Sequence, residues 1–226
     1  MAQKISIERI GREGVPVVVL DDFVPRPDLL IDDAAMLGFT PMGVHYPGVR
    51  ATVPPALVRR FIEPLALLMK EVFGVHDCMV IDSLYSFVTT PPNGLTPTQR
   101  LPHFDGVEPE RLALLHFLTD ASTSGTAFYR HRTTSFETVT AARLRGYEQT
   151  LADEIIQDGI PAAAYIDGDT ALFEEVAVFE GRYNRALLYP SNALHCARIP
   201  NHLEFSADVT TGRLTVNTFL TGHVGK

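Results

Sequence analysis

The chain has 226 residues and 46% of them are hydrophobic, which is enough for one large domain with a sizeable core. Its formal net charge is -8 and its basic residues form only short clusters, so neither a nucleic acid nor an anionic membrane surface is an expected partner. No apolar run approaches the roughly 20 residues that cross a bilayer, and the N-terminus lacks a basic-then-apolar leader. Two cysteines, Cys78 and Cys196, do not make a disulfide framework, and we expect a cytoplasmic protein.

The first 78 residues predict a lead-in of short strands and helices. Residues 5–20 indicate one or two short strands, because they contain three consecutive β-branched valines. A helix is expected from about 27 to 37, where a proline and an aspartate mark its start. A second helix is expected over 55–73, where apolar residues recur at three- and four-residue spacing, with a kink at Pro64.

From Met79 onward, short apolar runs alternate with turn residues, which is typical of an all-β barrel or sandwich. The exception is 137–160, where apolar residues step at helical spacing and predict a helical insertion at about 130–165. No linker is evident, so we expect one domain over 1–226, with the barrel in 79–226. The eight predicted strands are Met79–Thr89, Gln99–Phe104, Leu112–Thr119, Thr126–Tyr129, Val176–Phe179, Ala186–Tyr189, Leu194–Ala197 and Arg213–Leu220.

Two candidate metal ligands stand in the segment Pro102–Gly106. His103 and Asp105 are two residues apart, so on a strand their side chains share one face. One imidazole and one carboxylate are two thirds of a facial triad, which a second histidine completes while leaving coordination positions open. His195, in a late strand, is the candidate third ligand, although taken alone it is equally compatible with a buried structural histidine.

The final predicted strand has one mostly polar face. Arg213, Thr215 and Asn217 alternate with apolar residues there. An arginine that points into a barrel needs an anionic partner, because an unpaired buried charge is costly. The alternative is that Arg213 lies on the surface of an edge strand.

The order of these motifs resembles a known superfamily. A His-x-Asp pair, a Gly-Thr-x-Phe strand, a distal histidine and an Arg-x-Thr strand over 79–226 are similar to the Fe(II)/2-oxoglutarate-dependent dioxygenases, especially their prolyl-hydroxylase-like branch. Residues 18–37 also resemble the lead-in of that branch. The stretches 46–50, 99–105 and 125–132 resemble a bacterial subgroup without an assigned substrate.

The resemblance implies a mainly β fold, namely a double-stranded β-helix of the jelly-roll or cupin-like kind, with N-terminal helices packed outside and a helical insertion between barrel strands. It implies that His103, Asp105 and His195 ligate Fe(II). Arg213, helped by Thr215, would bind the distal carboxylate of the cosubstrate 2-oxoglutarate.

Further implications concern the rest of the pocket and the reaction. Tyr85 would line the cosubstrate pocket, and Ser124 departs from the branch's Gly-Gly-x-Thr-x-Phe pattern by replacing its first glycine. The implied activity is hydroxylation of a small-molecule or peptidyl substrate. Two alternatives stay open: a non-catalytic barrel that serves as a binding module, and a cupin-like metalloenzyme that does not use 2-oxoglutarate. The substrate's identity and the oligomeric state stay open too.

Several other polar residues are not assigned to the metal or to the cosubstrate. His116 lies in a strand that is apolar on both faces and is expected in the core. His131 is expected in solvent beside the insertion. Arg100 precedes the metal segment and is a weaker candidate for substrate contact, and Tyr46 and Arg50 are expected in an ordered loop near the entrance. We expect residues 130–160 to form a lid or wall over the open metal positions, because this connection far exceeds an ordinary loop of about 4–6 residues.

Overall fold

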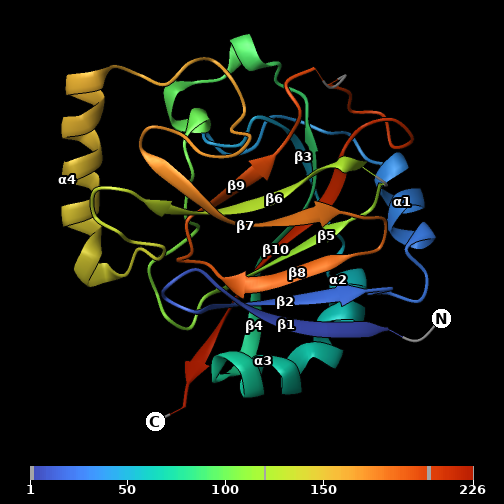
Figure 1. The fold of residues 1–226 in the computed structure, drawn as a ribbon. Helices are drawn as coiled ribbons and strands as arrows, with labels where there is room; N and C mark the ends of the chain where they lie inside the picture. The colour runs from blue at the N-terminus through green and yellow to red at the C-terminus, as the bar shows by residue number, and fades with distance from the viewer. Residues whose placement is uncertain (1–2, 120, 203–204, 226) are drawn as a thin grey trace.

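The computed structural model describes residues 3–119, 121–202 and 205–225. The fold is mainly β, with two antiparallel sheets that face one another (Figure 1). The larger sheet has the order β1-β2-β8-β5-β10-β4-β3, and the smaller has the order β7-β6-β9. This two-sheet arrangement is consistent with the jelly-roll or cupin-like fold expected from the sequence. The strands are β1 Lys4–Ile10, β2 Val15–Asp21, β3 Gly48–Thr52, β4 Val75–Val88, β5 Leu112–Phe117, β6 Ala121–His131, β7 Phe173–Gly181, β8 Ala186–Pro190, β9 His195–Arg198 and β10 Leu214–Val224.

The central strands β2, β5 and β8 of the larger sheet are buried on both faces, which explains their continuous apolar runs. In β2, Val17 and Val19 pack between the two sheets, while Val18 and Leu20 face the N-terminal helices. Residues of β5 divide between the same two cores. Because side chains alternate along a strand, a strand covered on both sides needs apolar residues at every position.

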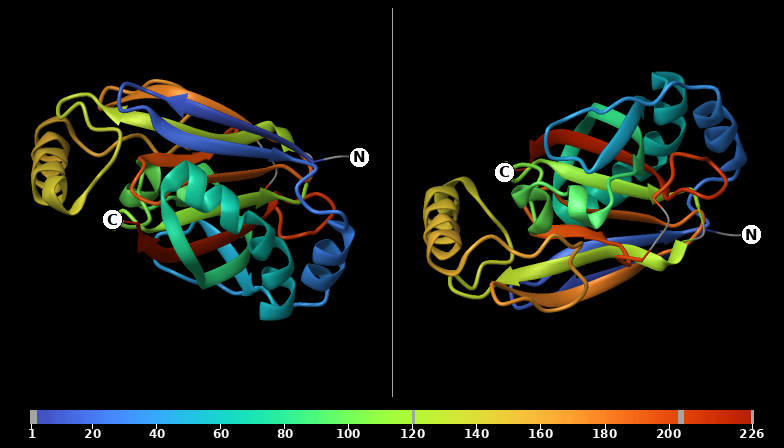
Figure 2. Two further views of the ribbon diagram at one scale, coloured as in Figure 1. Left: turned by 90° about the horizontal axis from the view of Figure 1, so that it is seen from below. Right: turned by 90° about the horizontal axis from the view of Figure 1, so that it is seen from above.

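Three helices cover the outer face of the larger sheet, opposite the smaller sheet (Figure 2). They are α1 Asp28–Ala35, α2 Pro55–Ile62 and α3 Ala66–Phe73. The expected break at Pro64 is confirmed, because a 3-10 turn over Glu63–Leu65 separates α2 from α3. Proline lacks the amide hydrogen that a continuous α-helix would require there.

The predicted helix in 137–160 is α4, Ala141–Asp158, which lies between β6 and β7 in the chain. It stands at one end of the sheets in both views (Figure 1 and Figure 2). Tyr147 is its one buried residue, and the Tyr147 ring meets Phe104 with 6.1 Å between centroids. The helix therefore packs against the segment that carries His103 and Asp105.

The expected strand at Gln99–Phe104 is wrong. Residues Pro97–Arg100 form a 3-10 helix, which Thr96 and Gln99 cap through reciprocal side-chain to backbone hydrogen bonds. Only His103 then pairs with a strand, as an isolated bridge to His195. The physical reason is that Pro97 favours a helical start and Pro102 has no amide hydrogen for a ladder.

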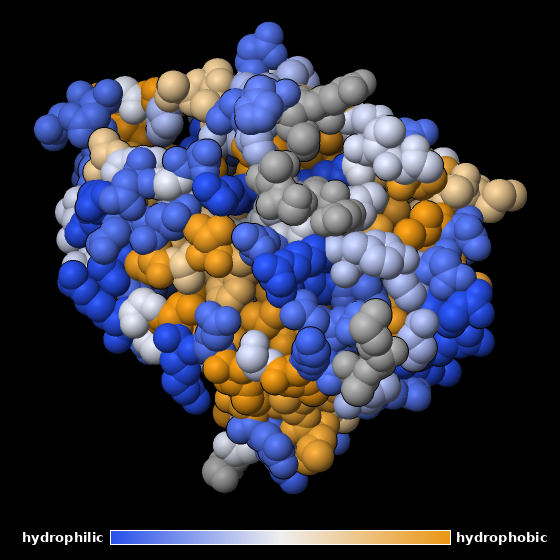
Figure 3. Space-filling view, turned by 45° about the vertical axis from the view of Figure 1, so that its right-hand side comes forward, coloured by the Kyte–Doolittle hydropathy of each residue, from blue (hydrophilic) through white to orange (hydrophobic). Residues whose placement is uncertain are grey.

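Within the described residues, none of the helices has the length and apolar character needed to span a bilayer. Cys78 and Cys196 are both free thiols. The face shown in Figure 3 carries hydrophobic side chains between hydrophilic ones, especially in the lower half of the view.

The buried carboxylate of Glu137 joins two distant parts of the fold. It accepts hydrogen bonds from the backbone amides of Arg12 and Glu13, at 2.8 and 2.9 Å, and from Arg130 Nε at 2.8 Å. Its residue is only 3% exposed. Although burial raises the pKa of Glu137, these donors outweigh burial and hold it below its usual value. Glu137 thereby fastens the β1–β2 turn to the end of β6.

We predict that Glu137→Gln lowers the free energy of unfolding by about 1.5–3 kcal/mol at pH 7, because it removes one of the two carboxylates that pair with the buried Arg130 and leaves it only Glu174. A depressed carboxyl pKa stabilises the fold above the unfolded value of roughly 4.3, and this contribution is lost as the pH falls through the folded pKa. The difference between the variant and the wild type should therefore shrink in acid. Urea unfolding at several pH values measures it, with the exposed Glu71→Gln as the control. Equal stability at pH 7 would contradict the role given to Glu137.

Candidate functional site

His103 and His195 face each other across an antiparallel backbone bridge. The amide of His103 donates to the carbonyl of His195, and the amide of His195 donates to the carbonyl of His103, each at 2.8 Å. Residues opposite each other in such a pair project their side chains to the same face. The two imidazole rings consequently lie 4.4 Å apart between centroids.

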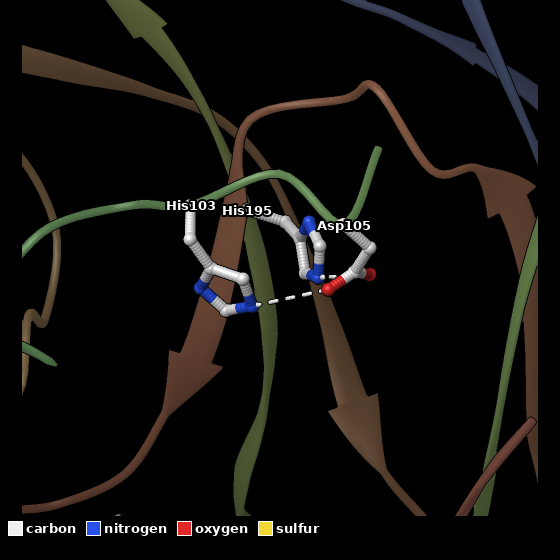
Figure 4. Close-up of side chains that lie close together, drawn as sticks. All are labelled: His103, Asp105 and His195. Carbon is white, nitrogen blue, oxygen red and sulfur yellow. Dashed lines mark ion pairs between the residues drawn. The ribbon is translucent and has the colours of Figure 1, made fainter. Parts of the chain in front are cut away.

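Asp105 reaches the same place from the turn that follows His103. Its amide donates to the carbonyl of Ser191 at 2.7 Å, which fixes this turn against the β8–β9 connection. One Asp105 carboxylate oxygen lies 3.7 Å from His103 Nε2, and the other lies 3.5 Å from His195 Nε2. The three side chains point toward one another (Figure 4), and one ligand atom from each lies within 4.8 Å of the others.

The two histidines are in states suited to metal binding. Nδ1 of His195 is 2.9 Å from the carbonyl of Ala193, so this nitrogen carries the proton and leaves the lone pair of Nε2 toward Asp105. Desolvation, followed by the neighbouring His195, lowers the pKa of His103 to about 4, although 54% of its side chain is open to the cavity. His103 is therefore neutral at pH 7, as a ligand must be.

Two imidazole nitrogens and one carboxylate oxygen, all on one side of a cavity, make a facial donor set. Such a set suits Fe(II) and overlaps with what other divalent first-row metals accept. It leaves coordination positions free on the cavity side. The residues present therefore fit the metal that the sequence suggests.

A cavity of about 580 Å³ opens beside these three side chains. It extends between the sheets as far as Arg213, Thr126 and Asn217. Helix α4 supplies part of its wall through Tyr147, Glu148 and Leu151. This volume lies in the usual range for small-molecule sites.

Arg213 lies just before β10 and is buried in the cavity wall. One terminal nitrogen donates to the carbonyl of Gly125 at 3.1 Å, while Nε is buried without a partner. Burial lowers the pKa of Arg213, and no carboxylate is among the groups that act on it in the described residues. Gly125 is needed here, because a Cβ would lie 2.1 Å from the carbonyl oxygen of Phe179. A buried guanidinium in this state calls for an anion.

Three tyrosines that the sequence reasoning did not place in the pocket surround this guanidinium. Tyr46, Tyr165 and Tyr189 line the cavity and interact electrostatically with Arg213. The Tyr46 hydroxyl is buried without a hydrogen-bond partner, and so is that of Thr126. A signal was available for Tyr189, because its hydroxyl is the one polar group in the apolar run of β8.

Two expected cosubstrate contacts are not where they were predicted. Tyr85 pairs with Val216 and packs on the helix side of the sheet, where its hydroxyl donates to Asp33 at 2.9 Å. Strand alternation turns it away from the cavity. Thr215 is fully buried, and its hydroxyl donates to the carbonyl of Ser86 at 3.4 Å rather than lining the cavity.

The remaining histidines and Arg100 have structural partners. His116 is in the core, as expected, with Nε2 3.1 Å from the Asn184 side-chain oxygen. The expectation of a solvated His131 is wrong, because this residue is fully buried and its Nε2 lies 2.7 Å from a carboxylate oxygen of Glu154 on α4. Arg100 donates to the carbonyls of Leu95 and Pro161, which occupies its guanidinium.

Comparison with known proteins agrees with this geometry. A model of the family described as "Family of unknown function (DUF6445)" matches residues 1–220. No curated protein sequence matches the chain. Among solved structures, HygX from Streptomyces hygroscopicus, with nickel, 2-oxoglutarate and hygromycin B bound, has a TM-score of 0.53 at 10% identity, over 93% of this chain and 84% of that one.

The non-heme alpha ketoglutarate dependent epimerase SnoN from nogalamycin biosynthesis has a TM-score of 0.51 at 11% identity, over 91% of this chain and 77% of that one. At such identities the likeness shows the fold. It confirms that the chain has the fold of the superfamily expected from its sequence, the Fe(II)/2-oxoglutarate-dependent oxygenases.

We predict that wild-type protein binds one divalent metal and that His103→Ala and Asp105→Ala each abolish stoichiometric binding. Each variant removes one of three donors while leaving the backbone bridge in place. Calorimetric titration with Fe(II) without oxygen, paired with circular dichroism, measures binding and folding separately. His45→Ala is the matched control, because His45 lines the same cavity outside the cluster. Wild-type metal affinity in both variants would contradict this site.

Proposed function

Since this chain belongs to the family of unknown function DUF6445, its activity is inferred from its site, and we propose that it is an Fe(II)- and 2-oxoglutarate-dependent oxygenase. It would hydroxylate a small-molecule or peptidyl substrate on a double-stranded β-helix. The observation that carries the proposal is one cavity with a His-Asp-His donor set on its wall and an arginine without a carboxylate partner further in.

His103, Asp105 and His195 would hold the metal. When bound, Fe(II) would supply the oxidative chemistry in which 2-oxoglutarate, O₂ and substrate yield succinate, CO₂ and hydroxylated substrate. The chain's own contribution is geometric. The backbone bridge holds the two imidazoles on one face, and the hydrogen bond from His195 Nδ1 to Ala193 fixes the ring's orientation.

Arg213 would bind the distal carboxylate of 2-oxoglutarate. Its buried Nε is free to donate, and the buried Tyr46 hydroxyl is a second free donor on the same cavity. A guanidinium and a hydroxyl together satisfy a carboxylate with charge-assisted hydrogen bonds. The bond from Arg213 to the carbonyl of Gly125 holds the guanidinium in place before the cosubstrate arrives.

The walls of the cavity would exclude water from the reacting atoms. Tyr147 of α4 lies over Phe104, next to His103, and Leu151 extends this apolar wall. The insertion is held by the contact of His131 with Glu154. A substrate bound beneath α4 would be screened from solvent on that side.

Two other functions share part of this evidence. A cupin-like metalloenzyme would need the three donors but has no use for an unpartnered buried Arg213. A non-catalytic binding module would need the cavity but not two imidazoles and a carboxylate gathered within 4.8 Å of one another. Both features together favour the oxygenase.

We predict that Arg213→Leu weakens 2-oxoglutarate binding by about ten-fold to a few thousand-fold, because it removes a charge-assisted contact made in a buried setting. Fe(II) binding should stay nearly unchanged, since Arg213 lies outside the donor set. Arg213→Lys should restore part of the affinity, because an ammonium lacks the planar fork. Calorimetric titration of iron-loaded protein with 2-oxoglutarate without oxygen measures these effects.

The exposed Arg60→Leu on α2 is the matched control and should bind 2-oxoglutarate like wild type. Succinate formation under oxygen gives an independent measure of the reaction. No binding of 2-oxoglutarate to the wild type, or equal affinity in Arg213→Leu, would overturn the oxygenase in favour of one of the other two functions.

A further inference from the structure

A second arginine, Arg50 on the edge strand β3, also lines the cavity. Its guanidinium carbon lies 3.7 Å from the centre of the Tyr46 ring, which covers one face of the group. Its Nε is buried without a hydrogen-bond partner, and no carboxylate among the described residues forms an ion pair with it. The edge of the guanidinium is thus held in position but has no acceptor to bind.

Arg50 interacts electrostatically with two of the metal donors, Asp105 and His103, and also with Asp82 on β4. No carboxylate of the described residues is among the groups that act on Arg213. The two arginines therefore have different surroundings in one cavity, since Arg213 is buried and Arg50 is half-buried and acts on the metal donors.

The formal charges of the filled site leave Arg50 unbalanced. Two positive charges of the metal and one of Arg213 are offset by Asp105 and the two carboxylates of 2-oxoglutarate. Among the described lining residues, Glu148 on α4 is the remaining carboxylate, and it is exposed. Arg50 is then a half-buried cation without an ion-pair partner among the described residues, because Asp105 is already counted against the metal and Asp82 acts on Arg50 without forming an ion pair; burial already lowers the pKa of Arg50. Such a group favours a bound anion.

Another part of the cavity wall is apolar. Leu101, Phe104, Leu151 and Ile166 line it, and they pack against one hydrophobic cluster. A ligand that contacts both Arg50 and these residues needs an acidic group and an apolar body.

We propose that the primary substrate is a carboxylic acid with an apolar body, and that Arg50 binds its carboxylate beside the metal. This inference rests on the oxygenase function proposed above and adds the substrate's chemical class. A single guanidinium matches the single charge of a carboxylate, whereas a phosphate dianion would leave one charge unmatched. Arg50 is thereby a specificity-determining residue, and Tyr46 is its positioning residue through the ring contact.

The test compares matched acids and amides that differ in charge alone. Protein loaded with Ni(II) and 2-oxoglutarate, which holds the site without turnover, is titrated with 4-phenylbutyrate and 4-phenylbutyramide, hexanoate and hexanamide, and N-acetyl-leucine and its amide. The acids should bind wild type about ten- to a hundredfold more tightly than the amides. Arg50→Gln should abolish this preference, and Arg50→Lys should keep part of it.

Arg60→Gln, an exposed arginine on α2, is the matched control and should keep the full preference. Three outcomes overturn the proposal: acids that bind wild type no better than amides, an unchanged preference in Arg50→Gln, or loss of 2-oxoglutarate binding in Arg50→Gln, which would assign Arg50 to the cosubstrate. A wrong oxygenase proposal is distinguishable from a wrong role of Arg50, because in that case the wild type does not bind 2-oxoglutarate. The acid and amide titrations on protein loaded with Ni(II) alone then still decide the role of Arg50.

Discussion

The reciprocal pair of hydrogen bonds between His103 and His195 is the interaction on which the site depends. It adds the His103 segment to the edge of the smaller sheet beside β9, and it brings together two side chains that are far apart in the chain. Asp105 depends on the same pairing, because its own amide bond to Ser191 continues the contact into the next turn. Since the bridge is made by backbone atoms, it survives changes in the side chains that it positions.

Two arginines with different surroundings line the one cavity. Both arginines are held by contacts that leave donor capacity unused, Arg213 by the carbonyl of Gly125 and Arg50 by the ring of Tyr46. Neither group forms an ion pair with a carboxylate among the described residues, although Asp105 and Asp82 act on Arg50. Tyr46 is common to both surroundings, because its ring contacts Arg50 and it also acts on Arg213. Unused donors on two guanidinium groups in one cavity are the basis for the proposed anionic ligands.

Much of the fold was predictable because hydrophobic periodicity reports burial directly. The valine run of β2, the break at Pro64 and the helix α4 follow from local sequence. The strand expected around His103 failed, because periodicity says nothing about whether a partner strand is within reach, and two prolines limit pairing there. The grouping of His103, Asp105 and His195 was predictable from residue types and order, and their role as metal ligands stays a prediction. The cosubstrate contacts were harder to predict. The register of β4 with β10 determines on which face of the sheet Tyr85 lies, and the sequence does not give this register.

The position of α4 separates the shape of the cavity from the geometry of the three metal donors. The helix contributes Tyr147, Glu148 and Leu151 to the cavity but none of the donors. In the chain it lies between β6 and β7 and is connected to each of them by a loop. Substitutions in α4 can therefore reshape the cavity while the donors keep their geometry. Over evolutionary time, related chains could differ in the shape of the cavity by changing this one segment, while the three clustered side chains stay the same.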